Sequence, residues 1–167
     1  MPSSTSWWGG KVRQFGRHVT GAVTPAERRD LSARLTRPQF LLFESMHPAD
    51  QRHGLDVEAY LLAAGERDGD LLLAGLLHDA GKGRSVGVWH RVAWSLGERY
   101  GPRARGIAAH LPGFAGAFDL LERHAARSAD LALQAGCSAR TAELIRNQSA
   151  PVEPIAGEAL RRADEAC

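Results

Sequence analysis

The sequence predicts an all-α fold with a single domain. Three observations favour it: apolar residues recur at intervals of three and four, several stretches start with helix-capping residues, and alternating β-branched stretches typical of strands are missing. A chain of 167 residues also suits one domain with a sizeable core. We expect a helical bundle of roughly seven or eight helices, with an N-terminal arm and a capped helix over 1–37 and the main helical domain over 38–167.

Composition and charge exclude some classes of function. The chain carries 21 basic and 19 acidic residues, a net charge of +2, which is too balanced to predict a nucleic-acid partner. No apolar run approaches the ~20 residues of a membrane-spanning helix. The cysteines, Cys137 and Cys167, do not form a disulfide framework, and no secretory signal is visible, so we expect a cytoplasmic protein.

The N-terminal segment combines tryptophans with basic residues. Trp8, Val12, Phe15 and Val19 recur at helical spacing. This pattern allows an interfacial anchor on a membrane surface, but the segment is short, so an arm packing on its own domain is the favoured interpretation. The same apolar arm is compatible with a homodimer.

The remaining elements follow from capping residues, apolar faces and breakers. Thr24 and Glu27 form a capping-box pattern around Pro25, and Pro48 opens a longer helix that carries His53. Asp70 precedes an apolar run to Ala80, which predicts a buried helix capped by Asp70 and ended by Gly81. Further helices are expected over 38–46, 86–100, 116–134, 139–148 (capped by Ser138) and 158–166, with an irregular stretch over 101–115.

The end of the buried helix carries the most informative residues. His78 and Asp79 follow the apolar run directly, and Lys82 comes three residues later. Two polar side chains at the end of a buried helix cost several kcal/mol unless they are satisfied, and a metal ion is one way to satisfy them. Because adjacent helical residues point about 100° apart, other elements must supply the opposite side of such an ion. His53, 25 residues before His78, and Asp164 on the last helix are the candidates.

Four stretches in this order resemble the HD superfamily of metal-dependent phosphohydrolases. The signature is Leu76-Leu77-His78-Asp79-Ala80-Gly81-Lys82, and the resemblance covers roughly residues 40–167. The other three stretches are the first-histidine helix at Gln51–Val57, a later helix starting with His124, and a terminal aspartate helix at Leu160–Asp164.

The resemblance implies an HD-type bundle in which His53, His78, Asp79 and Asp164 hold one divalent metal. Nitrogen and oxygen donors together admit Mn, Fe, Mg, Zn, Co or Ni. Related two-metal enzymes carry a histidine pair where this chain has Asn147 and Gln148, and the GYP stretch of that branch is absent. We therefore expect one metal and no cleavage of cyclic dinucleotides.

The implied activity is hydrolysis of a phosphomonoester or phosphodiester by metal-activated water. Asp79 and Lys82 would be the catalytic residues, and Lys82 and His124 would bind a small phosphorylated substrate, with a nucleotide as one candidate. A non-catalytic metal- or nucleotide-binding regulatory module of the same fold is the alternative. A structural helical adaptor is a third interpretation.

Simpler interpretations stand beside these assignments. A single histidine such as His53 is more often structural than a ligand, and Asp164 could be a solvated surface acid. Structural roles are expected for His18, His47 and His90, whereas His110 could reach the cleft. The arginines at 103, 105, 161 and 162 are expected on solvated faces.

Overall fold

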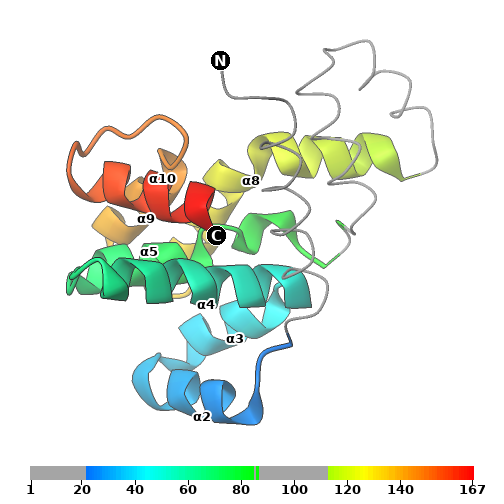
Figure 1. Ribbon diagram of the computed structural model, residues 1–167. Helices are drawn as coiled ribbons and strands as arrows, with labels where there is room; N and C mark the ends of the chain where they lie inside the picture. The colour runs from blue at the N-terminus through cyan, green and yellow to red at the C-terminus, as the bar shows by residue number, and fades with distance from the viewer. Residues whose placement is uncertain (1–21, 85, 87–112) are drawn as a thin grey trace, which may run out of the picture.

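A computed structural model of the chain describes residues 22–84, 86 and 113–167. Within these residues every regular element is a helix, which confirms the predicted all-α class (Figure 1). The predicted N-terminal arm, the helix over 86–100 and the residues His18, His90, His110, Arg103 and Arg105 lie outside the described residues, apart from Val86. No helix in the described part is long and apolar enough to cross a membrane.

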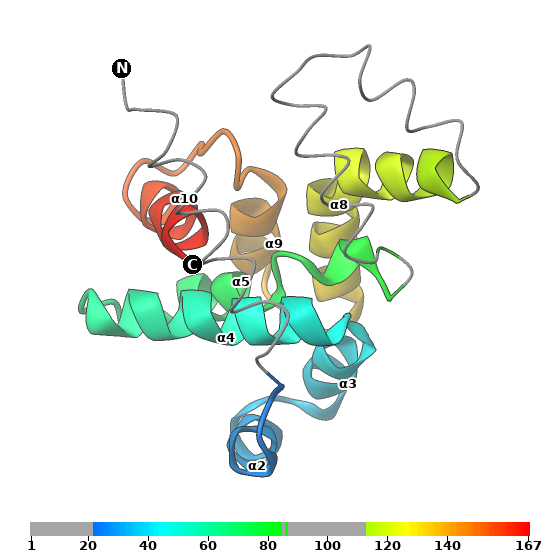
Figure 2. The same ribbon diagram turned by 45° about the vertical axis from the view of Figure 1, so that its right-hand side comes forward.

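Two short capped helices form one end of the molecule. α2 (Pro25–Arg34) starts with the predicted capping box, in which Glu27 N donates to Thr24 Oγ1 at 3.2 Å and Thr24 N donates to Glu27 Oε2 at 2.8 Å. α3 (Arg37–Ser45) starts with a similar box, formed by Thr36 and Gln39. Both views place α2 at the far end from α10, next to α3 (Figure 2). Buried Leu31 connects α2 to the main hydrophobic core.

α4 (Pro48–Ala63) and α5 (Gly69–Leu77) pack closely against each other. A Cβ added to Gly54 would lie 2.4 Å from the carbonyl oxygen of Leu76, so this approach requires glycine in α4. The predicted burial of α5 holds for Leu71, Ala74, Leu76 and Leu77, which are 0% exposed, whereas Leu72 and Leu73 are only partly buried. The contact brings the middle of α4, where His53 lies, beside the end of α5.

Two details of α5 differ from the prediction. Its N-cap is Asp68, whose Oδ1 accepts from the backbone of Asp70 and Leu71. Asp70 instead accepts hydrogen bonds from Ser138 and Thr141, so it connects α5 to the start of α9. The helix ends at Leu77 rather than at Gly81, because the chain turns at His78 and Asp79 into a 3₁₀ turn, η1 (Ala80–Lys82).

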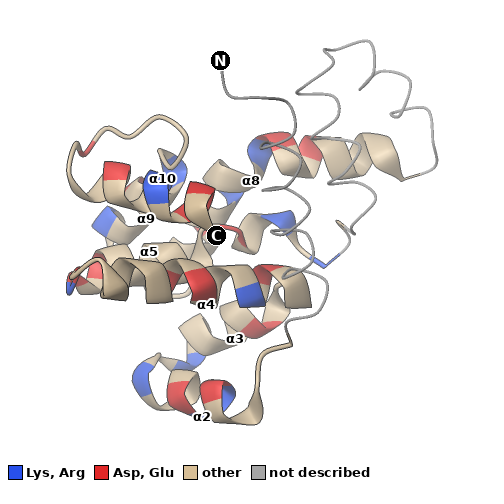
Figure 3. Ribbon diagram, in the orientation of Figure 1, with Lys and Arg blue, Asp and Glu red and all other residues tan. Residues whose placement is uncertain are grey.

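Three further helices complete the described bundle: α8 (Phe114–Gln134), α9 (Ala139–Arg146) and α10 (Ala156–Ala166). Their bounds agree with the predicted helices to within two residues at every end, and Ser138 caps α9 as expected. α8 contacts both η1 and α9, whereas α10 packs on α4 and α5. Both acidic and basic residues lie along α2, α4 and α10 (Figure 3).

Candidate metal centre

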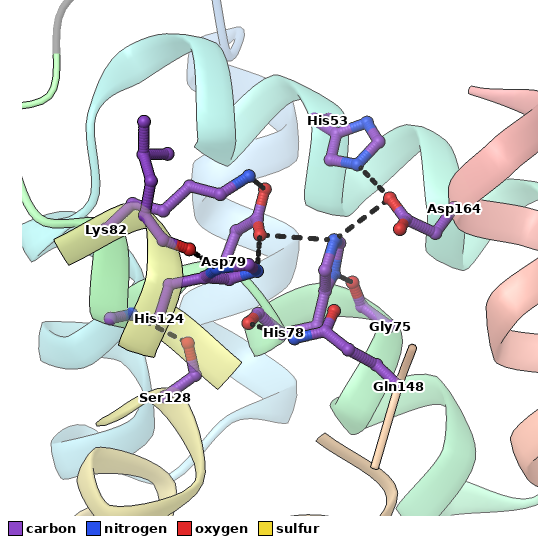
Figure 4. Close-up of polar contacts among 11 residues, drawn as sticks. His53, Gly75, His78, Asp79, Lys82, His124, Ser128, Gln148 and Asp164 are labelled. Carbon is purple, nitrogen blue, oxygen red and sulfur yellow. Dashed lines mark hydrogen bonds and ion pairs between the residues drawn. The ribbon is translucent and has the colours of Figure 1, made fainter. Parts of the chain in front are cut away.

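His78 lies at the C-cap of α5 with its ring almost fully buried. Its Nδ1 is 2.9 Å from the carbonyl oxygen of Gly75, an acceptor, so Nδ1 carries the proton and donates. This orientation points Nε2 toward two carboxylates, with Asp164 Oδ1 at 3.3 Å and Asp79 Oδ1 at 3.6 Å (Figure 4). In the neutral ring Nε2 is therefore a lone pair presented to two anionic oxygens.

His53 reaches the same point from α4. Its Nε2 lies 2.8 Å from Asp164 Oδ1, and its ring meets the ring of His78 edge to face with centroids 5.1 Å apart. His53 is 4% exposed, which is unusual for a polar side chain in the middle of a helix. The burial follows from the close α4–α5 approach at the neighbouring Gly54.

Asp79 divides its two oxygens between two groups of partners. Oδ2 accepts from Lys82 Nζ at 2.5 Å, while Oδ1 faces Nε2 of His78 at 3.6 Å and Nε2 of His124 at 3.7 Å. Burial raises the pKa of Asp79, but the Lys82 ammonium and the imidazoles of His78, His53 and His124 lower it well below its usual range. Asp79 is therefore an ionised carboxylate in an almost fully buried position.

Asp164 arrives from α10 and closes the cluster. Burial raises its pKa, but hydrogen bonds with His53 and His78 outweigh burial and hold the pKa far below its usual range. Its side chain is 41% exposed, against 6% or less for His53, His78 and Asp79. Asp164 thus forms the solvent-facing edge of the cluster.

His124, in the middle of α8, lies on the other side of Asp79. Its Nδ1 donates to the carbonyl oxygen of Leu121 at 2.6 Å, which points Nε2 at Asp79. Burial lowers the pKa of His124, and the partly opposing pull of Asp79 does not restore it. His124 and Lys82 therefore flank Asp79 on the side away from His53 (Figure 4).

The cluster fits a divalent cation by the chemistry of its donors. One candidate ligand atom from each of His53, His78 and Asp79 lies within 4.8 Å of the others. Burial lowers the pKa of His78, yet the charges of Asp79 and Asp164 raise it to about 9 from 6.5, so the surroundings of this ring favour an added positive charge. His78 Nε2 is also buried, and the nearer of the two carboxylate oxygens that it faces is Asp164 Oδ1 at 3.3 Å, a contact too poorly aligned for a good hydrogen bond. Such a lone pair, oriented by a carbonyl at the opposite ring nitrogen, is the usual arrangement of a ligating histidine.

Two buried polar residues lie next to the cluster: Ser128, which the sequence did not single out, and Gln148, which the sequence singled out only as a poor ligand for a second metal. Gln148 donates to the carbonyl oxygen of His78 at 3.4 Å, and Ser128 Oγ accepts from the backbone N–H of Gly81 at 2.8 Å. Neither contact has a local sequence signal, because both join residues at least 47 positions apart. They hold the turn after α5 from two sides.

Other sequence candidates take structural positions. His47 caps α4, with Nδ1 accepting from Ala49 N at 3.2 Å. Arg161 pairs with Glu158 and Glu165 on the surface of α10, as a solvated face would. A separate cavity of about 120 Å³ lies between α9 and the start of α10, and its lining includes Leu144, Pro151 and Gly157 but no residue of the cluster.

Comparison with known proteins finds no matching family model, no matching curated protein and no matching solved structure. The geometry of the cluster is therefore the main indication of what this chain does.

Proposed function

We propose that this chain is a metal-dependent phosphohydrolase with one divalent ion held by His53, His78, Asp79 and Asp164. The observation that carries the proposal is the meeting of these four side chains from α4, the end of α5 and α10, positions up to 111 residues apart. Two neutral imidazoles and two carboxylates balance the charge of a divalent ion. This donor set suits Mn, Fe, Mg, Zn, Co or Ni.

A divalent ion held by these residues would supply positive charge that polarises a phosphoryl group and makes nearby water more acidic. The chain's own residues orient the ligands. The Gly75 carbonyl fixes the ring of His78, and Lys82 holds Oδ2 of Asp79, so that Oδ1 is the oxygen turned to the cluster.

Lys82 and His124 are the proposed contacts for a phosphate. Both flank Asp79, and their side chains are 17% and 23% exposed, more than those of His53 and His78. The Lys82 ammonium is a point charge suited to phosphate and to the charge that develops in its hydrolysis. A small phosphorylated substrate, with a nucleotide as one candidate, would approach over this edge and the exposed side of Asp164.

A non-catalytic metal- or nucleotide-binding module is the second candidate. The observation that favours it is the depth of the cluster, because His53, His78 and Asp79 are each 4% exposed or less. So little exposure suits holding an ion more readily than turning over a bulky substrate.

Metal analysis and an activity panel separate the two candidates. Protein purified without added metal should contain close to one transition metal per chain by elemental analysis. Asp79→Asn should lose it, because the substitution removes a buried anionic ligand. Asp119→Asn, an exposed carboxylate on α8 paired with Arg123, is the matched control and should keep it.

The panel is p-nitrophenyl phosphate, bis-p-nitrophenyl phosphate and nucleoside phosphates, with added manganese. Hydrolysis by the wild type and the control, but not by Asp79→Asn, supports the enzyme. Metal binding without any turnover supports the binding module. The absence of metal from the wild type would overturn both.

A further inference from the structure

The turn that carries His78 and Asp79 lies directly on the backbone of α8. A Cβ added to Gly81 would be 2.4 Å from the carbonyl oxygen of His124 and 2.7 Å from the backbone nitrogen of Ser128. Only glycine allows this approach without movement of α8. Gly81 contacts one helical turn of α8, from His124 to Ser128. A shift of the 3₁₀ turn would therefore change the position of Asp79 relative to His124.

One buried hydrogen bond fixes this contact. The N–H of Gly81 donates to Ser128 Oγ at 2.8 Å, and Ser128 is 0% exposed. A buried N–H that loses its acceptor pays a desolvation cost, so the chain would shift to find another partner. Helix propensity does not explain a serine at position 128, because serine favours helix caps and turns over helix interiors.

The bond relates the two sides of the candidate centre. Gly81 is two residues after Asp79, and Ser128 is one helical turn after His124. Across the contact between η1 and α8, His124 Nε2 lies 3.7 Å from Asp79 Oδ1 (Figure 4). His53, His78 and Asp164 meet through α4, the end of α5 and α10, and their contacts with one another involve no residue of α8.

We propose that Ser128 is a positioning residue that sets the distance of His124 from Asp79 through the N–H of Gly81. It acts on the phosphate-binding side of the centre, because His53, His78 and Asp164 contact one another without contacting Ser128. The part of this inference that concerns phosphate rests on the function proposed above; the part that concerns the His124 ring does not.

The first test examines the His124 ring without any ligand. In protein labelled with ¹⁵N-histidine, Ser128→Ala should move the His124 Nε2 resonance and leave that of His53 in place, with His124→Ala identifying the signal. Ser138→Ala is the matched control, because it removes a helix-capping hydroxyl that contacts Asp70 and Thr141 and neither Gly81 nor His124. An unchanged His124 resonance in Ser128→Ala would overturn the positioning role. So would equal movement in Ser138→Ala, because that would show a general loss of stability.

The second test measures inorganic phosphate binding to manganese-loaded protein by ³¹P relaxation. Ser128→Ala should retain manganese affinity within about twofold and lose about tenfold in phosphate affinity, and adding Ser128→Ala to His124→Ala should cost no more, as expected for coupled residues. Additive losses in the double variant, or parallel losses of manganese and phosphate, would overturn the inference. A wild type that binds no manganese would refute the proposed function, and the resonance test would still decide the role of Ser128.

Discussion

At the scale of single residues, the candidate centre depends on which oxygen or nitrogen each side chain presents. The carbonyl oxygens of Gly75 and Leu121 accept hydrogen bonds from Nδ1 of His78 and His124, respectively. Both rings therefore turn Nε2 toward Asp79. Asp164 provides the fourth group and contacts both His53 and His78 through one oxygen. The negative charge of Asp164 thus interacts with both imidazoles.

Asp164→Asn tests this directly. The amide keeps the size of the side chain and removes the negative charge of a proposed ligand. Metal affinity, measured by competition with a chromophoric chelator, should therefore fall by at least the roughly tenfold to hundredfold typical of groups that only hydrogen-bond a ligand. Asp119→Asn serves again as the control on the surface of α8. Equal affinities in Asp164→Asn and wild type would remove Asp164 from the ligand set.

At the scale of elements, close helix approaches place the ligands. Gly54 lets α4 contact the backbone of α5 at Leu76, two residues before His78. Gly54→Ala should lower the free energy of unfolding by about 1–3 kcal/mol in urea denaturation, because a buried methyl group must displace the backbone.

A second alanine variant provides the comparison for Gly54. Gly116, in α8, has no atom within 4 Å of an added Cβ. Gly116→Ala should raise stability by about 0.5–1 kcal/mol through helix propensity. A stabilised Gly54→Ala would show that the α4–α5 contact is looser than described.

The start of α2 gives a pH-dependent prediction. Hydrogen bonds from the Arg52 side chain and the Thr24 backbone lower the pKa of Glu27 from 4.5 to about 2. A lowered folded-state pKa means that ionised Glu27 stabilises the fold above pH 4.5, and that this contribution is lost as the pH falls toward 2.

Glu27→Gln should therefore be less stable than the wild type at pH 7, and the difference should shrink in denaturation curves taken between pH 4.5 and 2.5, a range set by the lowered pKa of Glu27. Glu122→Gln, on the exposed side of α8, is the control without this capping role. A difference that stays constant with pH would contradict the role given to the Glu27 carboxylate.

At the scale of the whole molecule, local signals predicted the helices, and order along the chain predicted the cluster. Capping residues such as Thr24 and Ser138 and the apolar run after Asp70 are visible in the sequence because helix ends and buried faces are local properties. The expected grouping of His53, His78, Asp79 and Asp164 came from a family resemblance. In the structure Asp164 lies beside both histidines, and Asp79 lies beside His78.

What the sequence did not reveal arises from contacts between distant elements. Asp70 was expected to cap α5, but its carboxylate accepts hydrogen bonds from Ser138 and Thr141. Asp68 caps the helix instead. Ser128, in α8, and Gln148, two residues after α9, contact the turn after α5 only because these segments pack against it in the folded chain. Their roles depend on tertiary approach, which no local pattern encodes.

In the proposed centre, one cation connects α4, the turn after α5 and α10. Anomalous X-ray diffraction from crystals grown with manganese measures this most directly. A single strong peak within coordination distance of His53, His78, Asp79 and Asp164 is the expected result. A peak bound elsewhere on the chain, or manganese-soaked crystals with no peak beside His78, would contradict the account.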